Sequence, residues 1–487
     1  MFKPLKKLTA LALAGAMLFT GCTGKDGKSS SKYDKLLDPQ KPVSIEIWHY
    51  YNGPQKIAFD DLVAEFNETV GQEKGIVVNA VSQGNVNDLM QKVTDAANKK
   101  VGADEVPDIF AAYTDTAYAI DQLGLVADLD PYLTGDELDE YVASYIQEGR
   151  FGKGDPLKIF PTAKSTELMM LNKTDWDKFS AATGVTVDQL STVEGLCEVA
   201  EKYYDYSGGK AFFGRDAMAN YMLIGARQLG CELFSVKNGN VKLDLDKEVL
   251  KKLWDGYYVP YVHGYFAAKG RFRSDDAKTG DLIALVGSTS GAAYFPGQVV
   301  TSDTESYPID AMVLEPPVFA GGEKYAVQQG AGMVVTKSDE ATEYACTVFL
   351  KWFTDSQRNL EFSVSSGYLP VKTAANKVSS VDKALQSTAG DDSSVTQNLQ
   401  LSLPVAVGMV QNYTLYTTQG FENGNDARNV LEKSMQQKAD EDLKKVQAAV
   451  AGGQSQKQAA DSFCTDENFD SWYDSFCQQV ESAVNKG

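Results

Sequence analysis

Residues 43–53 read VSIEIWHYYNG, and this stretch decides the fold class when it is taken with two stretches that follow it. Ile45 and Ile47 fall on one side of an extended run that stops at an Asn-Gly-Pro turn, which predicts a strand followed by a helix. Residues 75–85 (GIVVNAVSQGN) and 106–113 (VPDIFAAY) repeat the pattern, and apolar helical faces lie between the three runs. This alternation at this spacing predicts an α/β fold in which helices cover a parallel sheet.

Later parts of the chain repeat this alternation. Strand candidates at residues 168–176 (LMMLNKTDW), 211–214 (AFFG) and 282–290 (LIALVGSTS) alternate with apolar helical stretches. A further strand and a long amphipathic helix follow within residues 326–353. Because the chain is 487 residues long, we expect two α/β bodies joined by more than one strand crossing. We place the first body at residues 43–161 and about 326–360, and the second at about 162–325 and 361–487.

The N-terminus carries the pattern of an export signal. Three lysines precede an apolar run at residues 8–19, which is shorter than the ~20 residues that a membrane-spanning helix needs. Residues 18–22 (LFTGC) resemble the signal of bacterial lipoproteins, which implies removal of residues 1–21 and acylation of Cys22. An ordinary export signal with a chance cysteine is the open alternative. We therefore expect residues 22–42 to be a lipidated, flexible tether that holds the chain to the extracytoplasmic face of the cell membrane.

Composition and charge exclude several classes of function. The formal net charge is −20, and removal of residues 1–21 with their three lysines makes it −23, so we expect no binding to a nucleic acid. The chain has two histidines and no Cys-x-x-Cys pair, so we expect neither a metal site nor a cofactor. Cys464 and Cys477 form either a local disulfide or two buried thiols.

Polar and aromatic residues follow the first three expected strands. In sheets of this class, ligands bind outside the carboxyl ends of the strands. The alternative for each of these residues is that it covers the hydrophobic core and does not contact a ligand. The residues are Trp48, Tyr50, Tyr51, Gln83, Asn85, Tyr113 and Asp115.

Several phrases resemble one protein family. Residues 106–117 (VPDIFAAYTDTA) and 124–133 (GLVADLDPYL) look like the first lobe of the extracellular solute-binding proteins of bacterial ABC importers, the family 1 group that includes maltose-binding proteins. Residues 160–176 are similar to the family's first crossing, and residues 330–371 resemble its return segment, which ends in Gly-Tyr-Leu-Pro. The resemblance continues more weakly through residues 423–435 (NGNDARNVLEKSM).

The resemblance implies a receptor with two lobes of the periplasmic-binding-protein type, whose ligand cleft lies between two mostly parallel, helix-covered sheets. Such a receptor closes on a small polar solute and presents it to the permease subunits of an importer. The implied ligand is a mono- or oligosaccharide, held by aromatic rings against its apolar faces and by planar polar side chains on its hydroxyls. We expect a monomer that binds its solute without chemistry.

By resemblance, residues 286–295 (VGSTSGAAYF) form the ligand-facing turn of the second lobe. The residues from Gly287 to Ser290 would begin a helix whose amides favour an oxygen-rich or anionic ligand, with plain N-capping as the equal alternative. Tyr294 is the expected stacking residue. The other candidates for ligand binding are Ser165 and Glu167 at the crossing, then Asp216, Ser288, Thr289 and Gln329.

A glycerol-phosphate-like or other polyol ligand is the first alternative. The ligand-facing turn holds small polar residues and no tryptophan, which resembles glycerol-phosphate receptors of the same group. Arg215, Arg271 and Arg273 would then bind phosphate, although we favour surface positions for them. A surface adhesin is the second alternative, since it would share the anchor and the acidic surface.

An enzyme, in particular a glycoside hydrolase, is the least favoured alternative. Residues 287–291 (GSTSG) have Thr289 at the position where a nucleophile elbow needs serine. The chain has no His-Glu-x-x-His, no phosphate-binding loop and no strand-linked Gly-x-Gly-x-x-Gly. Paired carboxylates remain an option because the 66 acidic residues offer many pairs.

Overall fold

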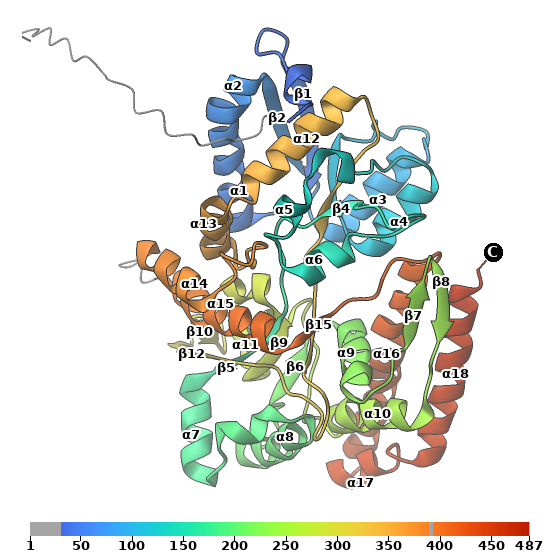
Figure 1. The fold of residues 1–487 in the computed structure, drawn as a ribbon. Helices are drawn as coiled ribbons and strands as arrows, with labels where there is room; N and C mark the ends of the chain where they lie inside the picture. Colours follow the sequence, from blue (N-terminus) through green and yellow to red (C-terminus); the bar gives the residue numbers. More distant parts are fainter. Residues whose placement is uncertain (1–30, 389–392, 487) are drawn as a thin grey trace, which may run out of the picture.

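The computed structural model describes residues 31–388 and 393–486 of the chain. Two α/β bodies are visible, each with one main sheet that helices cover (Figure 1). The expected signal at residues 1–21 and the expected lipidation site at Cys22 lie outside the described residues. Within the described ranges, no helix combines the length and the apolar character needed to cross a bilayer.

The first body contains a five-stranded sheet. Its strands, in spatial order, are β2 (Ile76–Ser82), β1 (Val43–His49), β3 (Ile109–Ala112), β14 (Gly332–Val335) and β4 (Ile159–Phe160). β1 pairs in parallel with β2 and with β3, which confirms the alternation predicted from the sequence. β14 runs antiparallel to both β3 and β4.

The second body contains a four-stranded sheet. Its strands, in spatial order, are β12 (Ala311–Leu314), β5 (Glu167–Asn172), β9 (Ala284–Ser288) and β6 (Phe213–Arg215). β6 and β9 are parallel, whereas β5 runs antiparallel to both of its neighbours.

Each main sheet thus contains one strand that opposes the others, so the predicted α/β class is confirmed but the sheets are mixed. The opposing strands are β14 and β5, and each is the first strand after the chain has crossed from the other body. A strand that enters from the junction of the two bodies begins at the junction, whereas strands such as β1 and β9 end there. The path of the chain therefore explains the direction of both strands.

Helices from both ends of the first body's sequence pack on its sheet and on one another. Phe59 and Phe66 of α1 are fully buried and meet Phe349 of α12 edge to face, so the predicted apolar face of α1 is confirmed. Phe362 of α13 stacks on Tyr368 in the same core, so the boundary expected at residue 361 falls within a helix that packs on α1. These helices are α1 (Gly53–Phe66), α2 (Gln72–Lys74), α3 (Val86–Ala97), α4 (Thr114–Gln122), α5 (Gly135–Leu138), α6 (Ala143–Glu148), α12 (Glu340–Phe353) and α13 (Ser356–Ser366).

The second body takes its helices from the middle and the end of the chain. The long helix α16 packs against α9, α10 and α18 (Figure 1). Cys464 and Cys477, in this C-terminal part, are free thiols. The helices are α7 (Lys173–Thr183), α8 (Val193–Ser207), α9 (Met218–Gln228), α10 (Lys247–Val262), α11 (Arg273–Thr279), α14 (Val378–Leu385), α15 (Ser394–Asn412), α16 (Gly424–Ala451), α17 (Gln456–Asp461) and α18 (Asp466–Val484). The short strands are β7 (Phe234–Lys237), β8 (Asn240–Leu243), β10 (Gln298–Val300), β11 (Ser306–Pro308), β13 (Tyr325–Val327) and β15 (Thr414–Tyr416).

Three segments of the chain lie side by side where the two bodies meet. Lys164 pairs with Leu369, and Ser165 pairs with Gln329, through antiparallel bridges. The buried ammonium of Lys164 donates to both carboxylate oxygens of Glu148, at 2.9 and 2.7 Å, and to a backbone carbonyl of a second crossing segment at 2.7 Å. This buried ion pair fastens the crossing segments to α6.

Residues 31–42, which we expected within a flexible tether, pack against the first body instead. The ring centroid of Tyr33 lies 4.8 Å from that of Tyr132 and 5.5 Å from that of Tyr344. Asp34 pairs with Lys74 at 2.9 Å and accepts a hydrogen bond from Tyr344. An aromatic ring and a carboxylate with partners on the first body give this segment a fixed place, which corrects the expectation for these residues.

His49 is a fully buried imidazole at the end of β1. Its Nδ1 accepts a hydrogen bond from the Tyr51 amide at 3.2 Å, and its ring packs against Phe59. Its Nε2 has no hydrogen-bond partner in the part of the chain that the structure describes. Burial lowers the pKa of His49 to about 4, so the folded protein holds this side chain neutral.

We predict that His49 makes the fold less stable as the pH falls from about 6.5 to about 4. In this range the unfolded state binds a proton at His49 and the folded state does not, which removes up to about 1.4 kcal/mol per pH unit. Asp115, whose pKa is raised to about 6 by burial, acts in the opposite direction. Urea unfolding of the wild type and of His49→Asn, which keeps an acceptor for the Tyr51 amide, isolates the effect. A stability difference between the two proteins that does not change with pH would contradict the prediction.

Candidate ligand-binding site

The strand ends at the junction bring polar residues of several segments together. Glu167 is the first residue of β5 and lies opposite Ser288, the last residue of β9. Arg215 is the last residue of β6, on the other side of β9. Gln329 comes from a crossing segment and pairs with the buried Ser165. The start of one strand and the ends of two others thus meet at one edge of the second sheet.

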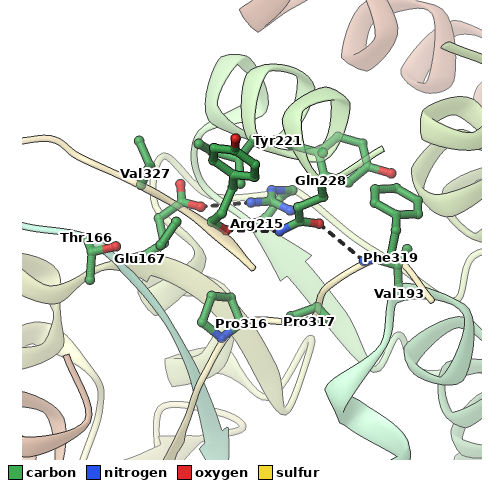
Figure 2. Close-up of a pocket in the computed structure, with 14 residues that line it drawn as sticks. Thr166, Glu167, Val193, Arg215, Tyr221, Gln228, Pro316, Pro317, Phe319 and Val327 are labelled. Carbon is green, nitrogen blue, oxygen red and sulfur yellow. Dashed lines mark hydrogen bonds and ion pairs between the residues drawn. The ribbon is translucent and has the colours of Figure 1, made fainter. Parts of the chain in front are cut away.

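Glu167 is the centre of this group. One carboxylate oxygen accepts a hydrogen bond from Arg215 Nη2 at 3.0 Å (Figure 2), and the other accepts from Asn220 Nδ2 at 2.8 Å. The guanidinium of Arg215 lies over the ring of Tyr221, 4.7 Å from its centroid. The side chains of Arg215 and Glu167 are only 10% and 8% exposed, so the ion pair is buried and its two charges compensate each other.

Asn220 links this ion pair to two other segments. It is buried in the first turn of α9, and its Nδ2 also donates to Gln329 Oε1 at 2.9 Å. Its Oδ1 accepts from Arg428 Nη2 of α16 at 2.6 Å. Neither Asn220 nor Arg428 is among the residues predicted from the sequence. Two features of the sequence point to them. Asn220 lies about one helical turn after the strand that ends at Arg215, and Arg428 lies within residues 423–435, where the family resemblance continues.

Tyr50 and Tyr113 are the aromatic residues of the first body at this junction. The hydroxyl of Tyr50 accepts hydrogen bonds from the Ala331 amide at 3.3 Å and from the Tyr368 hydroxyl at 3.2 Å. Burial raises the pKa of both Tyr50 and Tyr113, so both rings keep a neutral hydroxyl. The nearby charge of Arg428 acts on the pKa of Tyr113 in the opposite direction. Residues from the two bodies therefore lie within electrostatic range of each other.

Asp115 lies in the first turn of α4 and interacts electrostatically with Arg428. Burial raises the pKa of Asp115 to about 6, and the charge of Arg428 partly opposes this rise. Its Oδ1 is buried and accepts no hydrogen bond from any described residue. This oxygen packs against the backbone of Gly424 at the start of α16. A buried carboxylate oxygen without a donor is unfavourable, which agrees with the raised pKa of Asp115.

The expected ligand-facing turn forms a short 3₁₀-helix, η5 (Thr289–Tyr294). Thr289 is fully buried and its amide donates to the Thr166 carbonyl at 2.9 Å, so this amide is already paired. The hydroxyl of Ser288 is 2.9 Å from that of Ser290. Tyr294 is 47% exposed, and its hydroxyl donates to Asn52 of the first body at 3.2 Å. Tyr294 therefore connects the two bodies and still exposes about half of its surface.

Three of the expected ligand residues make local structural contacts instead. Trp48 is 3% exposed in the first core, and its Nε1 donates to Glu46 at 2.6 Å, so it does not supply the expected stacking surface. The physical reason is that a sheet covered on both faces buries side chains of both faces of β1. The side chain of Asn85 caps α3 by accepting hydrogen bonds from two backbone amides. The side chain of Gln83 accepts a hydrogen bond from Lys92 Nζ at 2.6 Å.

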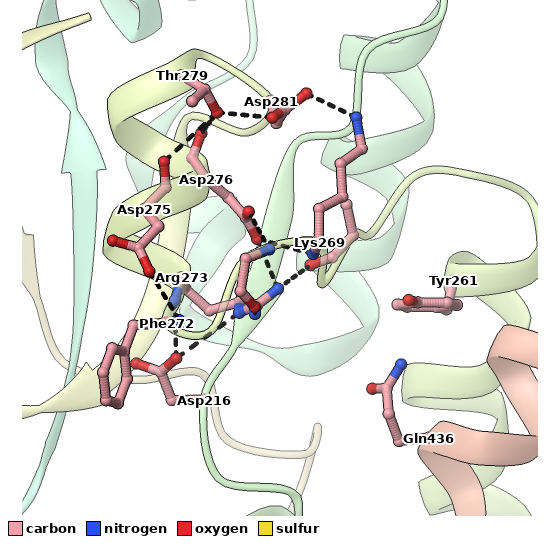
Figure 3. A network of polar contacts seen from close by, with 12 residues as sticks. Asp216, Tyr261, Lys269, Phe272, Arg273, Asp275, Asp276, Thr279, Asp281 and Gln436 are labelled. Atoms are coloured by element: carbon pink, nitrogen blue, oxygen red, sulfur yellow. Dashed lines mark hydrogen bonds and ion pairs between the residues drawn. The ribbon is translucent and has the colours of Figure 1, made fainter.

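Asp216 belongs to a buried network at the start of α11 (Figure 3). It accepts a hydrogen bond from the Arg273 amide at 2.8 Å. The guanidinium of Arg273 donates to Asp276 at 2.6 Å and to the carbonyl of Gly270. Burial raises the pKa of Asp216. Asp216 therefore holds the first turn of α11 in place beside the end of β6.

The surface positions that we favoured for Arg215 and Arg273 are wrong. Each guanidinium is buried, and each is paired with a carboxylate that compensates its charge. Arg271 is exposed, as expected, and lies over the ring of Phe272. The sequence shows the charges but not their partners, because Glu167 is 48 residues from Arg215 and Asp216 is 57 residues from Arg273.

A small cavity lies beside the ion pair of Arg215 and Glu167 (Figure 2). Its volume is about 30 Å³, and Tyr221, Gln228 and Phe319 contribute to its walls. The side chain of Gln228 accepts a hydrogen bond from the Phe319 amide at 3.2 Å and fixes this wall. A cavity of this size has room for about one water molecule and excludes a sugar ring.

Comparison with known proteins points to one family. Residues 61–389 match the family described as bacterial extracellular solute-binding protein. The maltotriose-binding protein of Pyrococcus abyssi (strain GE5 / Orsay) is 23% identical over 338 residues, which are 67% of this chain and 66% of that protein.

Two solved structures illustrate the shared fold. The cyclic alpha-maltosyl-1,6-maltose binding protein from Arthrobacter globiformis has a TM-score of 0.65 at 19% identity, covering 92% of this chain and 100% of that one. UgpB from Mycobacterium tuberculosis, solved in complex with glycerophosphocholine, has a TM-score of 0.66 at 18% identity, covering 91% and 99%. At these identities the likeness concerns the fold.

Proposed function

The chain belongs to the bacterial extracellular solute-binding proteins, whose members are receptors and not enzymes, and we propose that it binds a neutral saccharide for an ABC importer. The observation that carries the proposal is the polar group of Glu167, Asn220, Gln329 and Arg428 at the junction of the two bodies. Carboxylate, amide and guanidinium groups are planar and bind vicinal hydroxyls through paired hydrogen bonds. Tyr50, Tyr113 and Tyr294 supply the aromatic rings that such a ligand needs.

The ion pairs of Arg215 and Arg273 favour a neutral ligand. Arg215 is paired with Glu167, and Arg273 with Asp276, so neither guanidinium brings an uncompensated positive charge. The relatives support the same class, since the protein of Pyrococcus abyssi is named for maltotriose and that of Arthrobacter globiformis for a maltose-derived sugar. We therefore favour a mono- or oligosaccharide.

Capture requires the two bodies to act as lobes that close on the solute. The cavity of about 30 Å³ beside Glu167 has no room for a sugar ring, so a saccharide has to enter while the lobes are apart. A ligand that contacts both lobes is bound more tightly by the closed form, and this difference in affinity favours closure. The crossing segments at Ser165 and Gln329 are the connections about which such a motion would occur.

A phosphorylated polyol is the second candidate ligand, and Arg428 is the observation that favours it. Among the described residues, no carboxylate lies within ion-pair distance of its guanidinium, which donates to the amide oxygen of Asn220. The structure of UgpB from Mycobacterium tuberculosis was solved with glycerophosphocholine, a ligand with a phosphodiester. A guanidinium that is not paired with a carboxylate is well suited to bind phosphate oxygens.

We also propose that the receptor is anchored by lipidation of Cys22 at the extracytoplasmic face of the membrane and delivers its solute to permease subunits. The proposal is supported by the apolar run and the LFTGC pattern at residues 18–22. The first described residues, 31–42, pack on the first body, so the distance between the anchor and this body is set by few residues.

Isothermal titration calorimetry tests the proposed function. The panel contains maltose, maltotriose, maltoheptaose, glycerol 3-phosphate and glycerophosphocholine, with amino acids as a different class of solute. We expect saturable binding of a saccharide that is recovered unchanged. Asn220→Ala should weaken this binding about tenfold or more, because it removes hydrogen bonds to three partners in a buried site. Asn412→Ala, an exposed amide of α15, is the control and should bind as the wild type does.

A wild type that binds no member of the panel would contradict the proposed function, and so would a saccharide that is recovered cleaved. Binding of the phosphate-containing ligands alone, with affinity lost in Arg428→Gln, would replace the saccharide by the second candidate.

A further inference from the structure

Three glycines of the second body lie against one helix of the first body. Gly239 is at the tip of the hairpin formed by β7 and β8, Gly420 lies in the segment that leads from β15 to α16, and Gly424 is the first residue of α16. Figure 1 shows the hairpin and the start of α16 next to each other, below α4. All three glycines face the N-terminal part of α4, and we name them the glycine seat.

At all three positions a Cβ atom would lie closer to an atom of α4 than van der Waals contact allows, so either the backbone or a side chain of α4 would have to move. A Cβ atom at Gly420 would lie 2.6 Å from the carbonyl oxygen of Thr114 and 2.8 Å from Cβ of Tyr118. At Gly424 it would lie 2.3 Å from Oδ1 of Asp115. At Gly239 it would lie 2.3 Å from the hydroxyl of Tyr118.

At two of these positions, the short distance to α4 requires a glycine, and the backbone conformation does not. Gly239 has a φ of +77°, which favours glycine in any case. Gly420 and Gly424 are outside the left-handed region, so alanine could adopt their backbone conformation without strain. A buried hydrogen bond from Thr114 Oγ1 to the carbonyl of Thr418, at 3.2 Å, joins the same two surfaces.

The contact is one between the two bodies. Ala117 and Ile120 anchor α4 in the first core, and Phe421 anchors the neighbouring segment in the second core. The contact therefore forms when the bodies come together and is lost when they separate. Tyr113 and Asp115, which stand at the ligand site, are carried on the same turn of α4.

We propose that Gly420 and Gly424 of the glycine seat are positioning residues for ligand capture, which let α4 dock on the second body as the two bodies close. This inference rests on the proposed function. A side chain at either position keeps the first turn of α4, with Tyr113 and Asp115, away from Arg428. It removes none of the groups that we propose to contact the solute. Because the defect lies in closure, it lowers the affinity for every ligand by the same factor.

Gly420→Ala and Gly424→Ala test the inference in the full-length protein. Each should weaken the binding of maltotriose and of maltose about tenfold or more, and by the same factor for both sugars. At a maltotriose concentration that saturates the wild type, the radius of gyration of each variant, measured by small-angle X-ray scattering, should exceed that of the wild type, whereas the ligand-free proteins should scatter alike. The midpoint of urea unfolding should stay unchanged, because alanine is tolerated at both positions once the bodies are apart.

Gly408→Ala is the matched control, because a Cβ atom at this helical position of α15 meets nothing within 4 Å. It should bind and scatter as the wild type does. Seat variants that bind both sugars and scatter like the wild type would overturn the inference, and so would a loss of affinity for only one sugar, which is typical of a direct ligand contact. If the wild type binds no sugar but binds a phosphate-containing ligand of the panel, the saccharide proposal fails, and the same comparison of affinity and scattering with that ligand decides the role of the seat.

Discussion

Replacing Asp442 by alanine should lower the free energy of unfolding by about 2 to 3 kcal/mol, the upper range for the loss of hydrogen bonds to a buried charged group. Asp442 is fully buried in α16. Its carboxylate accepts from Lys438 at 2.7 Å, from Lys445 at 2.8 Å and from the Tyr258 hydroxyl of α10 at 2.6 Å. The substitution leaves the buried Tyr258 hydroxyl without its acceptor in the interface between the C-terminal helices and α10, whereas Lys438 and Lys445 can turn to solvent.

The pKa of Asp442 shows how strongly the folded state holds its charge. Burial raises this pKa, but the hydrogen bonds from Lys438 and Lys445 outweigh burial and lower it to about 2. The stabilisation is therefore present at neutral pH and is lost as the pH falls from about 3.8 toward 2. Urea unfolding followed by fluorescence measures the effect at neutral pH. Glu441→Ala, an exposed carboxylate on the same helix, is the control, and a loss below about 1 kcal/mol in Asp442→Ala would contradict the prediction.

Replacing Glu167 by alanine should weaken saccharide binding about 30-fold or more, because truncation of a buried, hydrogen-bonded charge at a binding site commonly has an effect of 2 kcal/mol or more. The carboxylate holds Arg215 at 3.0 Å and Asn220 at 2.8 Å. Without it, Asn220 loses the partner that orients it in the proposed site, and Arg215 becomes an unpaired buried cation.

Two variants separate this effect from a general loss of folding. Glu167→Gln keeps an acceptor for Asn220 but removes the ion pair, so its affinity should lie between those of the wild type and Glu167→Ala. Glu305→Ala, an exposed carboxylate of the second body, should bind as the wild type does. Calorimetric titration gives the affinities. Equal affinities for Glu167→Ala and Glu305→Ala would remove Glu167 from the site.

The sequence predicted the α/β class because the periodicity of residues 43–113 is a local property of the chain. β1, β2 and β3 form where the alternation of apolar residues placed them. The directions of β5 and β14 were not predicted, because they depend on where the chain crosses between the bodies. Hydrophobic periodicity locates a strand but contains no information on the direction of its neighbours.

The candidate site was predicted less completely than the fold. Glu167 lies in the crossing that the family resemblance indicated, whereas Gln329 was a candidate only from its place near a strand end, and Asn220 links the two in the structure. Trp48 was expected to stack on the ligand, but a strand buried on both faces gives no sign of which aromatic ring reaches a ligand. Asn220 and Arg428 were missed because they meet across 208 residues of sequence, and pairing at that distance is decided by tertiary packing.

The central claim is that two bodies close around a neutral saccharide at the group of Glu167, Asn220 and Arg428. Small-angle X-ray scattering of the protein, with and without a saturating concentration of the tightest-binding saccharide of the panel, tests it most directly. We expect a smaller radius of gyration in the complex, no such change in Glu167→Ala at the same sugar concentration, and recovery of the sugar intact. Identical scattering of the free and the saturated wild type would contradict the claim.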